Sequence, residues 1–184
     1  MKIGIDCRTI SEPAGVGTYT RELVRHLLEI DGHNQYALFF NDDFSGLPTG
    51  QAGTDEYKKQ NTEIIFLPSR KLKKFLPIIY SHFLIARAID QKKLDICVFP
   101  ANVIPLGYRG PSVLVVHDLA VYKFPQLFPS KLINFDRRIV IPSSLRRAAN
   151  IIAVSQSTKN DIAGLFKIPE EKIVVVYEGA AETK

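Results

Sequence analysis

The chain has 184 residues, 46% of them hydrophobic and 23% charged, and a formal net charge of +5. These proportions are ordinary for one globular domain and exclude a disordered chain, a collagen and a coiled coil. The only two cysteines, Cys7 and Cys97, cannot build a disulfide framework, and their apolar neighbours predict reduced thiols in the core. No secretory signal is evident, and the best apolar segment, Phe75 to Ile89, is too short to cross a membrane. The sequence therefore predicts a cytoplasmic protein.

Short apolar runs alternate with longer amphipathic segments along the chain. In chain order, the sequence predicts a strand at 2–7, a helix at 18–30, a strand at 36–40, a loop at 41–61 and a strand at 63–67. A helix at 74–91 follows, then strands at 95–99 and 112–117, a helix at 131–149, a strand at 151–154, a helix at 158–166 and a strand at 173–177. Helical spacing places Leu23, Leu27 and Ile30 on one face of the first helix, and Pro142 predicts a kink in the third.

The predicted strands are rich in Ile, Val and Leu and do not alternate cleanly between apolar and polar residues. That pattern is typical of strands buried on both faces, as in a parallel sheet covered by helices. We therefore expect an α/β domain with a Rossmann-like, doubly wound parallel sheet. Ligands bind beyond the carboxyl ends of such strands, so function is expected in the loops after Cys7, Phe40, Phe99, His117 and Val154.

The first of these loops ends in Gly15, Val16 and Gly17, directly before the first helix. Glycine lets a ligand approach the backbone closely, and a helix N-terminus favours a phosphate group, although two such glycines can equally form a structural turn. The dinucleotide fingerprint does not fit, because Thr20 stands where a third glycine is needed, and no Walker sequence follows.

His117 and Asp118 follow an apolar strand, and Ser155 follows another. A histidine at a strand end can donate to a phosphate or hydroxyl group, or act as an acid or base near neutral pH. The alternative is a buried histidine that is hydrogen-bonded to a loop backbone. Ser155 is either the cap of the next helix or a second contact for phosphate or sugar. The scattered histidines and cysteines predict no metal site.

Positive charge gathers in two segments. Residues 68–93 carry seven basic side chains against one acidic, and residues 130–150 carry five against one. Such clusters suit an anionic partner or form a solvated helix face. Between Arg70 and Gln91 the basic residues adjoin an apolar helix, which predicts docking to an anionic membrane surface unless the apolar side packs on the sheet. A second functional hypothesis is a non-catalytic, flavodoxin-like module that binds a nucleotide or nucleic acid, although no aromatic platform accompanies the basic runs.

Several segments occur in an order that resembles a known family. They are 3–8, 15–23, 116–120 with Phe124 and Pro125, 144–148, 151–162 and 169–176. Together they resemble the N-terminal domain of glycosyltransferase family 4 enzymes, which have the GT-B fold, and especially the group with bacterial mannosyltransferases of polysaccharide assembly. Ala14 is one departure, because many relatives have a glycine there.

The resemblance implies half of an enzyme with two Rossmann-like domains. Residues 1–177 would be the N-terminal domain on the acceptor side, and residues 178–184 would begin the interdomain linker. The C-terminal domain, which would bind most of the sugar nucleotide, is expected outside this chain, so the chain alone is expected to be inactive. The same resemblance implies no cofactor and no metal.

The implied reaction moves a hexose from a nucleotide-diphosphate sugar to a glycan or lipid-linked acceptor, with retention of anomeric configuration. By the resemblance, His117 would be catalytic and Gly15, Val16, Gly17, Asp118 and Ser155 would bind substrate. Peripheral contact with the inner face of the membrane is expected, and no nucleic acid partner.

Overall fold

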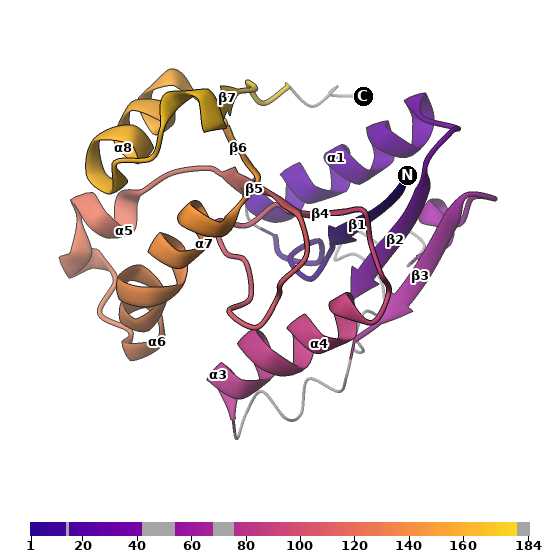
Figure 1. Ribbon diagram of the computed structural model, residues 1–184, viewed down its shortest axis with the longest axis horizontal. Helices are drawn as coiled ribbons and strands as arrows, with labels where there is room; N and C mark the ends of the chain where they lie inside the picture. Colours follow the sequence, from indigo (N-terminus) through magenta and orange to yellow (C-terminus); the bar gives the residue numbers. More distant parts are fainter. Residues whose placement is uncertain (14, 42–53, 68–75, 180–184) are drawn as a thin grey trace.

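In the computed structural model, residues 1–13, 15–41, 54–67 and 76–179 are described. They contain one seven-stranded sheet, in which every pair of neighbouring strands is parallel and the order is β3-β2-β1-β4-β5-β6-β7 (Figure 1). The strands are β1 (Lys2–Asp6), β2 (Gln35–Phe40), β3 (Thr62–Phe66), β4 (Ile96–Phe99), β5 (Ser112–Val116), β6 (Asn150–Ala153) and β7 (Ile173–Val175). The predicted Rossmann-like fold is confirmed.

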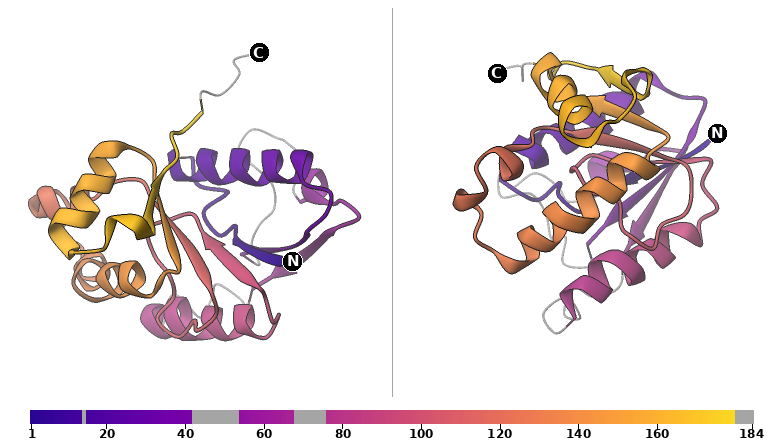
Figure 2. Two further views of the ribbon diagram at one scale, coloured as in Figure 1. Left: turned by 45° about the horizontal axis from the view of Figure 1, so that its top comes forward. Right: turned by 60° about the vertical axis from the view of Figure 1, so that its left-hand side comes forward.

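Helices cover both faces of this sheet. They are α1 (Gly15–Ile30), α3 (Pro77–Ile79), α4 (Ile85–Asp90), α5 (Ala120–Lys123), α6 (Lys131–Phe135), α7 (Ile141–Arg147) and α8 (Gln156–Phe166). Short 3-10 helices occupy Asp55–Tyr57, Pro125–Leu127 and Glu170–Lys172. Figure 2 shows α1 over one face of the sheet, with α3 and α4 over the other. The predicted loop at 41–61 thus contains a 3-10 turn, and its residues 42–53 lie outside the described residues.

The core forms two layers, one on each face of the sheet. Along β2, Leu38 and Phe40 point into the layer that also holds Val24 and Leu28 of α1. The intervening Phe39 belongs to the opposite layer, and all of these side chains are at most 5% exposed. Successive side chains of a strand point to opposite faces, so a strand buried on both faces reads as a continuous apolar run.

The buried face of α1 differs from the predicted one. Its buried residues are Gly17, Thr20, Val24 and Leu28, whereas Ile30 is 80% exposed. Apolar spacing missed this face because it contains the polar Thr20, which is buried. The Thr20 hydroxyl donates to the Val16 carbonyl at 2.8 Å and lies 3.1 Å from the Thr9 hydroxyl, so its burial leaves no lost hydrogen bond.

Two of the predicted helices contain a π turn. One turn (Tyr80–Leu84) joins α3 to α4, and the other (Asp136–Val140) joins α6 to α7. Pro77 lies in the first turn of α3, where a helix tolerates proline. Pro142 has no N–H group, and a proline ring crowds the carbonyl four residues earlier, so the wider turn before it accommodates the ring. The π turn thus lies directly before Pro142, and the kink expected there stays a prediction.

Candidate functional site

The strand order reverses between β1 and β4, which are neighbours in the sheet. Chain segments leave these two strands in opposite directions, which opens a crevice at their carboxyl ends. A cavity of about 300 Å³ lies there, which we call the switch-point cavity. The cavity is lined by the end of β1 and the loop after it, by Asn41 after β2, and by Ala101 and Val103 after β4. It is also lined by the α3 segment with its π turn and by α6 with the residue that follows it.

An ion pair between Asp6 and Arg8 forms part of the cavity wall. The Arg8 Nε and Nη2 atoms donate to the two Asp6 carboxylate oxygens at 2.8 and 2.6 Å, and the Arg8 backbone N–H donates to Oδ1 at 3.2 Å. Burial by itself would lower the pKa of the Arg8 guanidinium, but the Asp6 carboxylate, with smaller contributions from Tyr80 and Cys97, raises that pKa overall. Such a two-pronged contact fixes both side chains and cancels their charges against each other.

His82 lines the same cavity and is 5% exposed. Its Nε2 atom lies 3.5 Å from an Asp136 carboxylate oxygen, and its ring centroid lies 5.8 Å from that of Phe135. Its Nδ1 atom has no hydrogen-bond partner among the described residues. A buried polar atom without a partner is costly, so this nitrogen is suited to a ligand or water hydrogen bond.

The backbone of His117 is held on both sides. Its N–H donates to the Asn102 side-chain oxygen at 3.0 Å, and its carbonyl accepts from the Thr158 hydroxyl at 3.0 Å. Asn102 has a φ of 57°, in the left-handed region that asparagine tolerates better than most residues. Strained backbone of this kind persists where the surrounding structure fixes it, which is common at functional sites.

The ring of His117 is also held, and its side chain is only 11% exposed. Nδ1 lies 2.9 Å from the Glu178 carboxylate, and Nε2 lies 2.8 Å from the Pro100 carbonyl. A backbone carbonyl can only accept a hydrogen bond, so Nε2 is the donor in the contact with Pro100. The Tyr19 ring packs edge-on at 4.8 Å, and the pKa of its hydroxyl is raised by burial and by the charge of Glu178. The contact with Pro100 is the loop-backbone hydrogen bond of the alternative interpretation, and a role of His117 in catalysis stays a prediction.

The structure brings the beginning of α1 to His117, because Tyr19 lies two residues after Gly17. The two glycines have different surroundings. A Cβ atom on Gly17 would lie 2.0 Å from the Glu12 carbonyl oxygen, so Gly17 is needed for close packing of the preceding loop. A Cβ atom on Gly15 would meet nothing within 4 Å. Gly15 is exposed and Val16 is half-buried, and their predicted contact with substrate stays a prediction.

Asp118 and Ser155 both make local hydrogen bonds at helix starts. The Asp118 carboxylate accepts from the Ala120 N–H at 2.8 Å, where α5 begins. The Ser155 hydroxyl accepts from the Thr158 N–H at 3.0 Å and caps α8, as one of the two sequence interpretations had it. Asp118 is exposed, and binding of substrate by either residue stays a prediction.

Sequence reasoning did not select Asp6, Arg8, Asn41, His82 or Asp136. The position of the first two, at the carboxyl end of β1, was an available signal, because charged residues at that edge are close to the expected ligand crevice. The described residues contain no group of three or more His, Cys, Asp or Glu that could hold a metal ion. Within the described part of the chain, no helix is both long and apolar enough to span a bilayer.

The chain is similar to known glycosyltransferases in both sequence and fold. The chain is 25% identical over 146 residues to the O-antigen chain mannosyltransferase RfbU of Salmonella typhimurium (strain LT2). The aligned region covers 73% of this chain and 39% of that protein. The fold is similar to the apo form of the lipopolysaccharide outer core galactosyltransferase WaaB, with a TM-score of 0.56, 17% identity and coverage of 100% of this chain and 47% of that one. A glycosyltransferase from Rickettsia africae ESF-5 matches with a TM-score of 0.54, 19% identity and coverage of 97% and 43%.

The chain thus spans less than half the length of each of these relatives. At such low identity the two solved structures establish the fold alone. The comparisons give no support to a non-catalytic nucleotide-binding or nucleic-acid-binding module. The family model described as Glycosyltransferase Family 4 matches residues 13–182. That match covers six of the seven strands, all but β1, and it includes His117 and the whole of α1, so the chain belongs to Glycosyltransferase Family 4.

Proposed function

We propose that residues 1–177 are the acceptor-side domain of a retaining glycosyltransferase. The reaction moves a hexose from a nucleotide-diphosphate sugar to a glycan or lipid-linked acceptor. The observation that carries this proposal is the placement of His117, which lies beside the beginning of α1 and one residue away, through Pro100, from the cavity-lining Ala101. Similarity to a mannosyltransferase supports a hexose as the transferred group.

The beginning of α1 is suited to the leaving diphosphate. The first N–H groups of a helix have no partner within the helix, and the helix dipole favours negative charge there. Gly15 is exposed and has open space where a side chain would be, so a phosphate can approach its backbone closely. Preorganised N–H groups of this kind stabilise charge that develops in a transition state without a metal or cofactor.

His117 donates a ring hydrogen bond to the substrate in this proposal. Glu178 is the partner that substrate can replace, because its carboxylate side chain is 49% exposed and it follows directly after the domain boundary that we propose at residue 177. A phosphate or hydroxyl oxygen accepts from Nδ1 as the carboxylate does. The Pro100 carbonyl then keeps the ring in its orientation through Nε2. A positioned donor of this kind contributes about 100-fold or more to rate.

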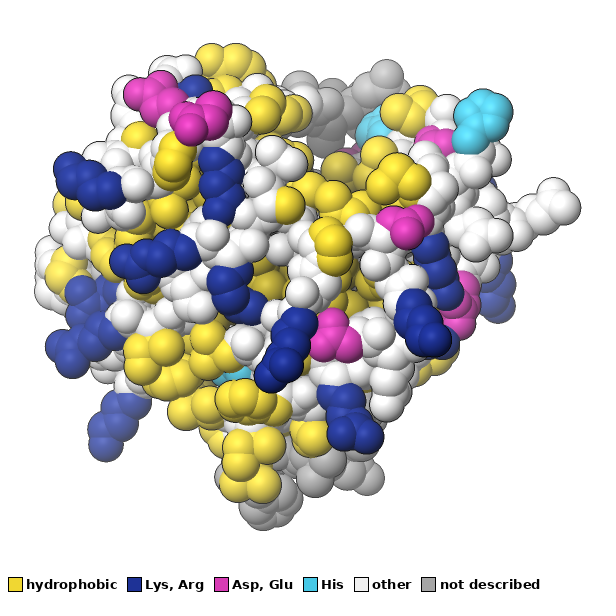
Figure 3. Space-filling model, in the orientation of Figure 1, with side chains coloured by type: hydrophobic (Ala, Val, Ile, Leu, Met, Phe, Trp, Pro, Cys, Tyr) yellow, Lys and Arg dark blue, Asp and Glu magenta, His cyan; other side chains and the backbone are white. Residues whose placement is uncertain are grey.

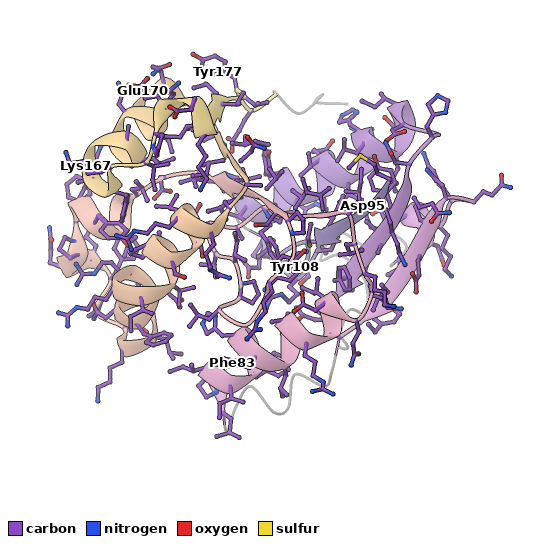
Figure 4. All side chains as sticks on the ribbon, in the orientation of Figure 1. Phe83, Asp95, Tyr108, Lys167, Glu170 and Tyr177 are labelled. Carbon is purple, nitrogen blue, oxygen red and sulfur yellow. The ribbon has the colours of Figure 1, made fainter. Side chains whose placement is uncertain are left out.

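The helix that contains α3 and α4 is proposed to contact an anionic membrane surface, on the cytoplasmic side. Its Ile85 and Ile89 pack into the core, but four large apolar side chains are between 37% and 52% exposed: Leu76, Ile78, Ile79 and Phe83. Figure 3 shows apolar side chains grouped at the lower end of the molecule, with Lys and Arg side chains around them. Figure 4 places Phe83 there, on the opposite side from Glu170 and Tyr177. The basic residues 70–74 lie outside the described residues.

The complete gene product that contains this chain provides the test of the catalytic proposal. We expect it to release a nucleoside diphosphate from one sugar nucleotide when an acceptor is present, and the anomeric configuration of the product, measured by NMR, to be that of the donor. The matched control is the same protein with His117→Ala. Failure of the folded complete protein to transfer from a full panel of sugar nucleotides and acceptors would contradict the proposal.

A further inference from the structure

We propose that the switch-point cavity binds one uncharged sugar ring of the acceptor and excludes acidic sugars such as uronic acids and sugar phosphates. This inference rests on the proposed function, and it names the class of acceptor that the same site selects.

The size and the apolar wall of the cavity suit a single ring. Its volume of about 300 Å³ is at the lower end of the range of about 300–1,000 Å³ that is typical of ligand sites. Ile78, Leu132 and Phe135 supply apolar surface on the side of α3 and α6. A sugar ring has a face of C–H groups and an edge of hydroxyl groups, so it needs a wall of each kind.

The charges in the cavity disfavour an anionic ligand. Three carboxylates, those of Asp6, Glu12 and Asp136, line it together with one guanidinium, that of Arg8. Arg8 is already bound to Asp6 by two side-chain hydrogen bonds, and among the described residues that line the cavity no other Lys or Arg offsets the charges of Glu12 and Asp136. Carboxylates accept hydrogen bonds from sugar hydroxyl groups but repel a carboxylate or phosphate on the ligand, which gives specificity by exclusion.

His82 gives a second, independent indication of a hydroxyl-bearing ligand. It is buried, it lines the cavity, and its Nδ1 atom has no partner among the described residues. A hydroxyl group both donates and accepts, so it can satisfy that nitrogen in either tautomer of the neutral ring. A phosphate or carboxylate can only accept, and so would need Nδ1 to carry a proton.

The cavity also lies where an acceptor sugar is useful. Ala101 lines it, and the preceding residue, Pro100, holds the His117 ring through its carbonyl. A sugar in the cavity and a group that reacts near His117 are therefore separated by one short stretch of backbone after β4. An acceptor bound there can present a hydroxyl group to the transferred hexose.

The test is an NMR titration of the 184-residue chain with two matched pairs of probes. Methyl glucoside and methyl mannoside are each compared with the methyl uronide that differs only by a carboxylate at C6. We expect at least one hexoside to shift the backbone signals of residues 6–9 and 132–136, with a dissociation constant at least about tenfold below that of its uronide. The Asp136→Asn and Glu12→Gln variants each remove one charge that repels the uronide. Each should therefore lower the ratio of the dissociation constant of the uronide to that of the hexoside.

Glu170→Gln is the matched control, because it removes the same charge from an exposed side chain that does not line the cavity, and it should leave the ratio of the two dissociation constants unchanged. Melting temperatures verify that each variant is folded, and the exposed Glu12 keeps the test valid should Asp136→Asn prove unstable. The inference is overturned if uronides bind as tightly as hexosides, or if no hexoside shifts these signals. In that case, transfer of a hexose by the complete protein would still support the proposed function. Failure of the cavity proposal can therefore be distinguished from failure of the proposed function.

Discussion

Gly15 and Gly17 provide a matched pair of substitutions that separates packing from ligand contact. In Gly17→Ala the added Cβ atom would lie 2.0 Å from the Glu12 carbonyl oxygen and 2.9 Å from that of Thr9. Both obstacles are main-chain atoms, so the loop after β1 must move to relieve the contact. Overpacking of this kind costs about 1–3 kcal/mol, and we expect the upper part of that range because the backbone cannot change rotamer.

A loss of about 2–3 kcal/mol corresponds to a fall in melting temperature of about 4–12 °C for a domain of this size. Gly15→Ala introduces the same methyl group two residues earlier, at an exposed position with nothing within 4 Å of the new atom. Surface substitutions of that kind change stability by at most about 0.5 kcal/mol, so its melting temperature should stay within about 2 °C of the unmodified chain.

Thermal and urea unfolding of the two variants, followed by circular dichroism, measure both effects. In the complete enzyme, Gly15→Ala should lower kcat/KM without loss of stability, because the methyl group occupies the space through which a phosphate would approach. A Gly17→Ala variant as stable as the unmodified chain would refute the packing argument. A Gly15→Ala variant as unstable as Gly17→Ala would refute the contrast between the two glycines.

Four other outcomes are expected. His117→Ala should lower turnover of the complete enzyme by about 100-fold. It should also lower the free energy of unfolding by about 1–3 kcal/mol, because the side chain is only 11% exposed and both ring nitrogens have a hydrogen-bond partner. Near-normal turnover of the variant would show that His117 has a structural role. The 184-residue chain alone should show no transfer in a nucleotide-release assay, because both walls of a cleft are needed to exclude water. The unmodified chain should float with anionic vesicles at low salt, and Phe83→Ser should lower the fraction of protein that floats. Ile30→Ser, which replaces another exposed apolar side chain by serine on α1, is the control and should lower that fraction less. Equal effects of the two substitutions would contradict the membrane proposal. Hydrogen bonds, chiefly from the Asn34 side chain, hold the pKa of Asp31 below its ordinary value. Their contribution to the stability of the fold should therefore be lost as pH falls below about 3.9, the ordinary pKa of an aspartate. The Asp31→Asn variant should accordingly show a smaller fall in melting temperature on acidification than the unmodified chain.

The sequence by itself determined the fold class and the position of every strand to within about two residues. It did so because parallel strands buried on both faces must be continuously apolar, and this signal is local to each segment. The same reasoning located the edge of the sheet where the ligand crevice lies, since carboxyl ends of parallel strands share one edge. It also identified His117 as a residue at that edge, and the resemblance identified the family.

Only the tertiary structure decided which side chains meet at that edge. Glu178 contacts His117 across 61 residues of sequence, and His82 meets Asp136 through two helices that precede different strands. Such pairs carry no local signal, because the distance between them is set by how helices pack on the sheet. Tertiary contacts likewise buried Thr20 and left Ile30 exposed on α1, against the apolar pattern, because the loop after β1 supplies a hydrogen-bonding partner for the Thr20 hydroxyl.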